Sequence, residues 1–297
     1  MAALGTLGIS FSAILVKLSA VSPAAAGFYR MAWAIPLLLL ISWLQRGESR
    51  RPLQPKGWLA GLVFALNLFL WHLSIDYIGA GLATVLANTQ VIFIALLGWL
   101  FLAERPSRTA LMLLPLLFAG VVLLTGLDGP AYGSNRGLGV VFGLLSGLTS
   151  ATYVLIFRSA SRELEPGSPP VGLLLQTTTA AAVAGLILGT ALDPGFSLAV
   201  PLSSHMWLIL LALSAQVAGW LLLGQALRTL SALETAMIML LQPVLALVWG
   251  WLIFAELASP VQAVGVAIVL ASIVTLNISQ ARSQRVTPAA IAAKEPT

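Results

Sequence analysis

Charged side chains are scarce in this chain: Asp, Glu, Lys and Arg make up 8% of its 297 residues, against about a quarter in a typical soluble domain. Apolar residues reach 59%, which is more than a soluble core needs. Cysteine is absent, which excludes disulfide frameworks and thiolate metal sites. The start of the chain also lacks the charged segment and cleavage site of a signal peptide. This composition predicts an integral membrane protein.

Ten apolar segments are long enough to cross a bilayer, which takes about 20 helical residues. Two boundaries are inferred. Residues 57–103 are too many for one span, and only Asp76–Gly81 offers turn chemistry there. Arg228–Glu234 must likewise divide the run that follows Pro201. The expected spans 1 to 10 are Ala2–Ser19, Pro23–Gln45, Lys56–Ile75, Ile78–Ala103, Pro106–Leu127, Arg136–Ser159, Pro169–Leu192, Pro201–Arg228, Ser231–Ala255 and Pro260–Ser279. We therefore predict an all-α polytopic membrane protein.

The basic residues predict the orientation, because Lys and Arg concentrate in short loops on the cytoplasmic side of membrane proteins. With the N-terminus inside, twelve basic residues fall in inner loops and the tail, against Arg136 alone outside. The twelve are Arg46, Arg50, Arg51, Lys56, Arg105, Arg108, Arg158, Arg162, Arg228, Arg282, Arg285 and Lys294. The net charge of +5 therefore indicates topology in the inner membrane rather than a nucleic-acid surface. Both termini are expected in the cytoplasm.

One stretch of the sequence occurs twice. Residues 79–104 align without a gap to residues 231–256, with 7 identities in 26 pairs, and the two copies end in GWLFLAE and GWLIFAE. The offset corresponds to five spans, an odd number, so the copies cross the membrane in opposite directions. Inverted repeats of this kind are typical of transporters. We expect a first repeat in residues 1–130, a second in 131–280 and a disordered cytoplasmic tail in 281–297.

Short motifs extend this pattern into a resemblance. Ten helices in a five-plus-five inverted repeat resemble the drug/metabolite transporter superfamily, and within it the EamA-like exporters. The residues that match the family's motifs are Pro23, Arg30, Glu104, Gly120, Pro243, Glu256, Gln262 and Gly265. Val91 and Ser272 depart from the pattern. The resemblance implies that spans 1–4 and 6–9 line the transport path and that spans 5 and 10 are peripheral. It further implies activity similar to that of YddG-type exporters of aromatic amino acids and methionine.

Two glutamines lie near the centres of spans 4 and 9. Gln90 aligns with Gln242 in the repeat, and an amide can both donate and accept hydrogen bonds to a substrate without adding charge. Pro243 withdraws a backbone donor and is expected to kink span 9, which frees a carbonyl near Met239. Both glutamines are therefore candidate substrate contacts. The alternative is that they join helices to one another.

Three further spans place polar groups beside aromatic ones. These stripes are Asn67, Trp71 and Ser74 in span 3, Gln216 and Trp220 in span 8, and Ser146, Ser150 and Tyr153 in span 6. A lining of this kind suits a small amphipathic ligand. The alternative for the tryptophans is anchoring at the membrane interface, and the depth of Trp71 and Trp220 favours the lining.

Four ionisable side chains complete the candidate residues. Arg30 has the planar fork that pairs with a carboxylate, although it could instead extend towards the outer surface. His72 lies towards the outer end of span 3, where an ordinary hydrogen-bonding role is the alternative to a titrating one. Glu104 and Glu256 end their helices at opposite membrane faces. They therefore cannot share a site, and each is interpreted, with Pro243, as part of a gate or hinge.

Small residues recur every four positions in two spans. The stripes are Gly139, Gly143 and Gly147 in span 6, and Ala263, Ala267 and Ala271 in span 10. Stripes of this kind let helix backbones approach closely. Internal packing is the expectation for both, and it favours a monomer over a dimer.

These features predict an alternating-access exporter of amino acids and related amphipathic metabolites. No carboxylate reaches mid-depth, which favours a facilitator driven by the substrate gradient over obligate proton antiport. The alternatives are efflux of lipophilic cations or drugs by proton antiport and, in another class, an intramembrane enzyme. The chain has no HExxH or GxSxG motif. We expect a small-molecule substrate and the lipid bilayer as partners, with no catalytic residue, cofactor, metal or nucleic acid.

Overall fold

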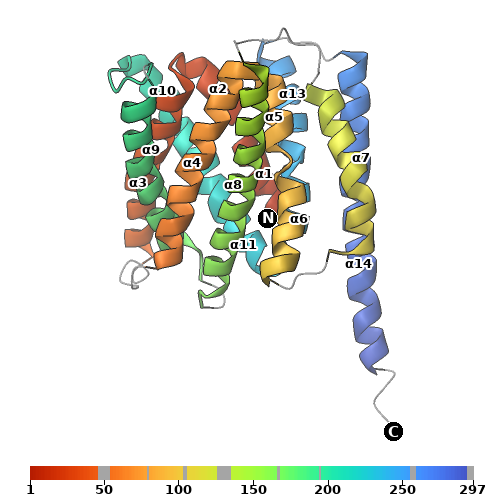
Figure 1. The fold of residues 1–297 in the computed structure, drawn as a ribbon. Coiled ribbons are helices and arrows are strands. Elements are labelled where there is room, and N and C mark those ends of the chain that lie inside the picture. Colours follow the sequence, from red (N-terminus) through yellow and green to blue (C-terminus); the bar gives the residue numbers. More distant parts are fainter. Residues whose placement is uncertain are drawn as a thin grey trace.

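The computed structural model describes residues 1–45, 54–78, 80–102, 106–125, 135–165, 168–193, 195–254 and 259–292. In these residues the regular secondary structure is helical, and the helices stand side by side in one bundle (Figure 1). Six helices are long and apolar enough to cross a membrane, and four shorter apolar helices accompany them. The prediction of an all-α membrane protein with ten helices is confirmed.

Six of the ten spans are single helices. They are α3 (Pro23–Leu44), α4 (Pro55–Ile78), α7 (Arg108–Thr125), α8 (Arg136–Arg162), α9 (Val171–Leu192) and α14 (Pro260–Ala292). The other four spans are divided: α1 (Ala2–Ser10) with α2 (Ser12–Ser19), α5 (Ala80–Ala87) with α6 (Gln90–Leu102), α10 (Leu202–Leu211) with the π-helix η2 (Ala212–Gly219) and α11 (Trp220–Thr229), and α12 (Ala232–Met239) with α13 (Leu241–Phe254).

Several helices run past the boundaries expected from the sequence. Asp76 belongs to the last turn of α4, which continues to Ile78 rather than turning at this aspartate. The eighth helix, α8, extends to Arg162 and includes Arg158, which was counted among the inner loops. The last helix, α14, passes Ser279 and reaches Ala292, so residues 281–292 of the expected tail are helical. These helices therefore continue past the charged residues near their expected ends.

Side-chain caps begin α3, α12 and α14. Ser22 accepts a hydrogen bond from the backbone N–H of Ala25, and Pro23 opens α3. Ser231 and Glu234 form a capping box at α12. Gln262 does the same with Ser259 at α14, because each side chain accepts from the other residue's backbone N–H, at 2.8 and 3.2 Å. Caps satisfy N–H groups that a helix start leaves unpaired.

Spans 4 and 9 are interrupted at equivalent positions of the repeat. Span 4 breaks at Asn88 and Thr89, and span 9 breaks at Leu240; position 88 shifted by the repeat offset of 152 residues is position 240. The causes differ. Asn88 and Thr89 bond backbone carbonyls of their own helix, at 2.9 and 2.5 Å, and such bonds compete with the helical ladder. In span 9, Pro243 has no N–H for the carbonyl four residues earlier. The expected interruption of span 9 is thus present.

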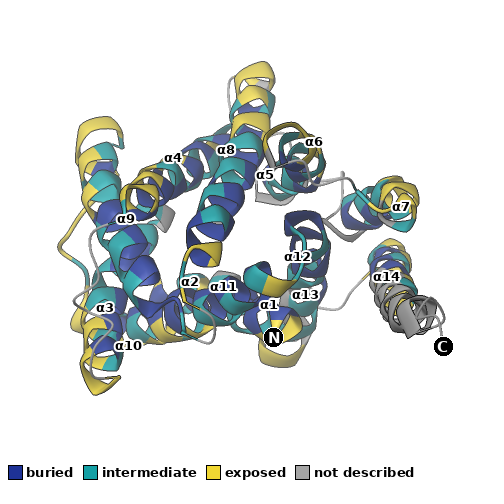
Figure 2. Ribbon diagram, turned by 90° about the horizontal axis from the view of Figure 1, so that it is seen from below, coloured by how far each residue is buried: buried dark blue, intermediate teal, exposed yellow. Residues whose placement is uncertain are grey.

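The helices divide into a main bundle and a peripheral pair. Within the bundle, α4 packs against both α8 and α9, and α3 packs against α9. The pair α7 and α14 packs mainly on itself and lies at one edge (Figure 2). Span 5 and span 10 are therefore peripheral, as the family resemblance implied.

The two small-residue stripes behave differently. In α8, a Cβ added at Gly139, Gly143 or Gly147 would lie 2.4 to 2.9 Å from atoms of α4, α5 or Thr89. The glycine stripe therefore packs internally, as expected. Ala263, Ala267 and Ala271 are exposed on α14, whereas Val269 and Ser272 are buried. Internal packing is therefore wrong for the alanine stripe, because α14 turns its other face to α7.

Basic residues gather at one end of the bundle. Lys56 and Arg108 lie at the starts of α4 and α7, and Arg162 and Arg228 lie in the last turns of α8 and α11. All four helix ends are at the lower end in Figure 1. Arg46, Arg50, Arg51, Arg105 and Lys294 lie outside the described residues.

We expect Gly61→Ala to destabilise the bundle. A Cβ on Gly61 would lie 2.3 Å from the Thr177 carbonyl oxygen and 2.6 Å from the Ala180 Cβ, so α4 and α9 must move apart at a cost of about 1–3 kcal/mol. Gly185→Ala is the matched control, because no atom lies within 4 Å of its added Cβ. Thermal unfolding in detergent should show a lower Tm for Gly61→Ala only. Equal Tm values for the two variants would contradict the close α4–α9 contact.

Candidate functional site

Arg30 begins a hydrogen-bonded chain of three side chains that joins three helices. It is the eighth residue of α3, about 10 Å along the helix axis from Pro23. Its Nε donates to the Gln216 Oε1 at 3.1 Å, and the Gln216 Nε2 donates to the Thr178 Oγ1 at 3.0 Å. Gln216 and Thr178 are fully buried. The chain therefore fixes one edge of the guanidinium against η2 and α9.

The π-helix η2 places Gln216 in the hydrogen-bonded chain that runs from Arg30 to Thr178. Gln216 lies within η2, between two α-helical parts of span 8. Close packing accompanies η2: a Cβ on Gly5 would lie 2.8 Å from the Gly219 carbonyl oxygen, and one on Gly8 would lie 2.7 Å from the Ser214 carbonyl oxygen. A π-helical turn widens a helix locally and is frequent at functional sites. Here the wide turn is matched by glycines on the neighbouring α1.

An aromatic cluster borders Arg30. The Arg30 Cζ lies 5.8 Å from the centroid of the Phe64 ring, within the range of a cation–π contact. Phe64 stacks on Tyr153, with centroids 4.5 Å apart, and Trp220 meets both rings edge-on at 5.9 and 4.7 Å. Phe157 closes the cluster at 5.7 Å from Trp220. The cluster of Phe64, Tyr153, Phe157 and Trp220 thus forms an apolar wall contributed by α4, α8 and α11.

This wall contains two buried donors without partners. The Tyr153 hydroxyl and the Trp220 Nε1 have no hydrogen-bond partner in the described part of the chain, although the residues are only 1% and 4% exposed. Buried polar groups are normally paired, so each exception calls for a reason. Arg30 adds further donors, since its terminal nitrogens form no hydrogen bond or ion pair with any described residue. Unused donors therefore gather around one apolar wall.

Acidic side chains lie away from this site. The described carboxylates are at helix ends and in connections: Asp76, Glu163, Glu165, Asp193 and Glu234. Glu234 serves the α12 capping box. No three His, Cys, Asp or Glu side chains gather as a metal site in the described segments. The site around Arg30 is consequently electropositive.

The two glutamines of the repeat directly follow the helix breaks. Gln90 is the first residue of α6, and Gln242 is the second residue of α13. The Ser150 hydroxyl donates to the Gln90 Oε1, so this amide joins span 4 to span 6. Gln242 and Pro243 are partly exposed. Both glutamines therefore border interrupted backbone, and Gln90 also joins two helices.

The span 3 stripe divides between helix packing and a more open position. The Asn67 Nδ2 donates to the Ser146 carbonyl oxygen at 2.8 Å and to its Oγ at 3.1 Å, while Ser74 donates to the Gly139 carbonyl oxygen at 2.9 Å. Asn67 and Ser74 thus bind α4 to α8. Trp71 is partly exposed, and its ring lies 5.4 Å from that of His72. Glu104 and Glu256 lie outside the described residues.

The structure thus brings four of the candidate residues together: Arg30, Gln216, Tyr153 and Trp220. Phe64, Phe157 and Thr178 are also part of the site, and sequence reasoning missed all three. Phe64 precedes Asn67 by three residues and so belongs to the same helical stripe. Extending that stripe by one turn would have found it. Thr178 lies within three consecutive threonines, and no periodic signal singles it out.

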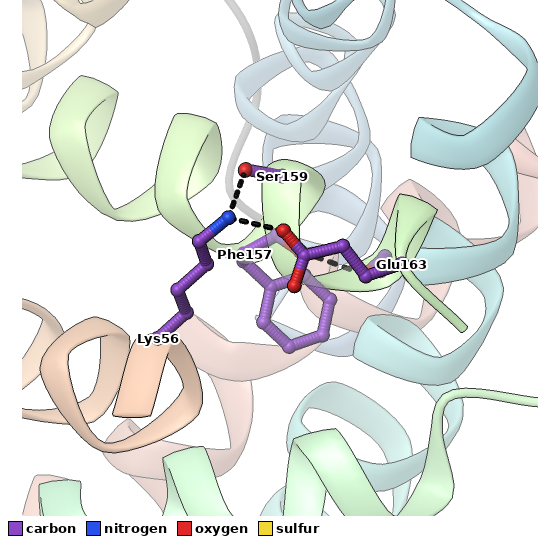
Figure 3. Close-up of polar contacts among 5 residues, drawn as sticks. Lys56, Phe157, Ser159 and Glu163 are labelled. Carbon is purple, nitrogen blue, oxygen red and sulfur yellow. Dashed lines mark hydrogen bonds and ion pairs between the residues drawn. The ribbon is translucent and has the colours of Figure 1, made fainter. Parts of the chain in front are cut away.

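Side-chain hydrogen bonds and an ion pair join neighbouring helices at the lower end of the bundle. Figure 3 shows Lys56, from the start of α4, reaching Ser159 and Glu163 near the end of α8. Arg158 is only 1% exposed and donates to the carbonyl oxygens of Leu227 and Leu230, both at 3.1 Å. Arg158 was counted with the basic residues of the inner loops, and it lies inside the expected span Arg136–Ser159, four residues before the end of α8. It lies within α8 because its guanidinium pairs with the carbonyls that the end of α11 leaves unbonded.

Comparison with known proteins connects the bundle to transporters. The EamA-like transporter family matches residues 1–126 and 137–278. An uncharacterized transporter of Synechocystis sp. is 29% identical over 263 residues, which cover 84% of this chain and 77% of that protein. Two uncharacterized transporters of Archaeoglobus fulgidus are 28% and 31% identical, and the matches span 56% and 52% of their lengths. A crystal structure with 15% identity, covering 94% of this chain and 96% of its own, has a TM-score of 0.78 and shows the same fold.

We expect Arg158→Met to reduce stability far more than Lys56→Met. Loss of the guanidinium leaves buried carbonyl groups without their hydrogen bonds, and each such group costs about 1–3 kcal/mol. The Lys56–Glu163 pair is 45% and 53% exposed, and exposed pairs contribute about 1 kcal/mol or less. Thermal unfolding in detergent would measure both. If Lys56→Met lowered the Tm as much as Arg158→Met, the structural role assigned to Arg158 would be refuted.

Proposed function

Because the chain belongs to the EamA-like transporter family, whose members are membrane transporters rather than enzymes, we propose that it exports amino acids and similar amphipathic metabolites. Aromatic amino acids and methionine, the substrates of YddG-type exporters, are the proposed class. The supporting observation is the position of Arg30: a guanidinium with free terminal nitrogens borders a buried aromatic cluster.

The two parts of this site match the two ends of an amphipathic acid. A guanidinium and a carboxylate form parallel charge-assisted hydrogen bonds, which are about twice as strong as neutral ones. The cluster of Phe64, Tyr153, Phe157 and Trp220 offers ring faces and edges to an apolar or aromatic side chain. Asn67, Trp71 and His72 are the proposed further contacts along α4.

Alternating access is the proposed mechanism, with residues 1–130 and 131–280 as inverted halves. The equivalent breaks at Asn88–Thr89 and Leu240 support it, because paired discontinuous helices are a feature of inverted-repeat transporters. The opposite directions of α5–α6 and α12–α13 fit the same scheme (Figure 1). Pro243, Glu104 and Glu256 are the proposed hinge and gate residues.

The proposed orientation has both termini in the cytoplasm and the protein in the inner membrane. Lys56, Arg108, Arg162 and Arg228 lie at one end of the bundle, and this end is cytoplasmic by the rule that basic residues stay inside. We propose a monomer that works as a facilitator. A fixed guanidinium repels cations, so the site disfavours efflux of lipophilic cations by proton antiport.

We expect Arg30→Gln to lower amino-acid counterflow in proteoliposomes by about 10- to 100-fold, since a hydrogen bond to a charged group contributes about 1.5–3 kcal/mol. The assay loads unlabelled phenylalanine or methionine inside and follows uptake of the labelled compound. Arg108→Gln is the matched control, because Arg108 is exposed at the start of α7. Equal flux in the two variants would remove Arg30 from the transport path.

Replacing the repeat glutamines should separate transport from helix packing. Gln242→Leu should reduce counterflow with little change in Tm, because no hydrogen bond of the Gln242 side chain to another described residue would be lost. Gln90→Leu should lower the Tm as well, since the Ser150 hydroxyl loses its acceptor. Unchanged flux in Gln242→Leu would place Gln242 outside the substrate path.

A further inference from the structure

We propose that the Arg30 site recognises a carboxylate without an accompanying ammonium group, and therefore prefers aromatic monocarboxylates to zwitterionic amino acids. The inference rests on the proposed function, because it concerns the same site. It adds the substrate class that the charge and hydrogen-bonding pattern of the site favours.

The free polar atoms next to the aromatic cluster are donors. They are the terminal nitrogens of Arg30, the Tyr153 hydroxyl and the Trp220 Nε1. Guanidinium and indole groups donate only, whereas a carboxylate is acceptor-only with about four lone-pair sites. A carboxylate can thus satisfy buried donors that have no partner in the described structure. An ammonium group, which only donates, cannot.

Each acceptor of this hydrogen-bonded chain already accepts one bond from within the protein. The Gln216 Oε1 accepts from Arg30, and the Thr178 Oγ1 accepts from Gln216. The Tyr153 hydroxyl can also accept, but the Tyr153 ring stacks on Phe64, whose ring Arg30 also faces. A substrate ammonium at that hydroxyl would therefore be repelled by the guanidinium.

The hydrogen bond to Gln216 determines which edge of Arg30 is available. It uses Nε, which leaves the edge formed by the two terminal nitrogens. Two parallel N–H groups on that edge match the two oxygens of a carboxylate. Gln216, held in turn by Thr178, is thus a positioning residue that aims the guanidinium.

Charge balance gives the same preference. No described carboxylate pairs with Arg30, so the site carries one positive charge. A monocarboxylate neutralises this charge, whereas a zwitterion leaves the net charge at +1 and an amine raises it to +2. Uncompensated charge is costly in a water-poor environment. The order of binding should therefore be monocarboxylate, zwitterion, amine.

Three ligands with one aromatic body test this order: 3-phenylpropanoate, phenylalanine and phenethylamine. Titration calorimetry with the purified full-length protein in detergent should give a Kd for 3-phenylpropanoate about tenfold or more below that for phenylalanine. Phenethylamine should not bind. Binding of phenylalanine without binding of 3-phenylpropanoate would overturn the inference and leave the proposed export of amino acids standing. Failure of all three ligands would refute both.

Two conservative variants test the donors. Tyr153→Phe and Trp220→Phe keep a ring but remove the O–H or N–H, and each should weaken binding of 3-phenylpropanoate by about 10- to 100-fold, the loss of one hydrogen bond to a charged group. Tyr153→Phe should leave the Tm of the ligand-free protein unchanged or raise it, because the hydroxyl lacks a partner. A lower Tm with unchanged binding would show that the hydroxyl is structural.

A third variant tests the positioning role of Gln216. Gln216→Met should weaken binding of 3-phenylpropanoate, and phenethylamine should still not bind. Binding of the amine by this variant would contradict the positioning role.

Discussion

The fold depends on one constraint: hydrocarbon offers no hydrogen bonds to the backbone, so each crossing segment must satisfy its own peptide groups. The described spans meet it by being helical. At the break in span 4 and at the end of α11, polar atoms are supplied from within the protein. Asn88 and Thr89 bond the carbonyls of their own turn, and Arg158 bonds those at the end of α11. At these places other groups of the protein replace the missing backbone bonds.

Much of the fold could be predicted from the sequence because the same constraint makes long apolar runs visible. All ten apolar helical segments were expected, because each long apolar run had to be helical. The boundaries were less accessible. Asp76 looked like the start of a turn but belongs to the last turn of α4, and α8 continues three residues past the expected end at Ser159. A charge can remain inside a helix if packing supplies its partners, as it does for Arg158. Those partners belong to a distant segment and leave no local signal.

The site was predictable as separate residues but not as a group. Arg30, Gln216, Tyr153 and Trp220 stood out because polar and aromatic side chains are informative in an apolar chain. Helical periodicity shows which residues share a face of one helix, but not which faces meet. Phe64 continues the stripe of Asn67 by one turn, but its stacking on Tyr153 became visible only once α4 was seen to face α8. The interhelical bonds of Asn67 and Gln90 were hidden for the same reason.

The proposed inverted repeat and the proposed site differ in symmetry. Alternation between two faces favours equivalent halves, and the breaks in spans 4 and 9 are equivalent. The charged residue is not duplicated: Arg30 lies in α3, whereas its counterpart in the second half, α9, contains no charged residue. Two guanidinium groups facing one small ligand would repel each other. Instead α9 contributes neutral Thr178, which holds Gln216 against Arg30. The proposed scaffold is therefore symmetric where its halves have to move. The proposed site is asymmetric, because only one half contributes a charged residue.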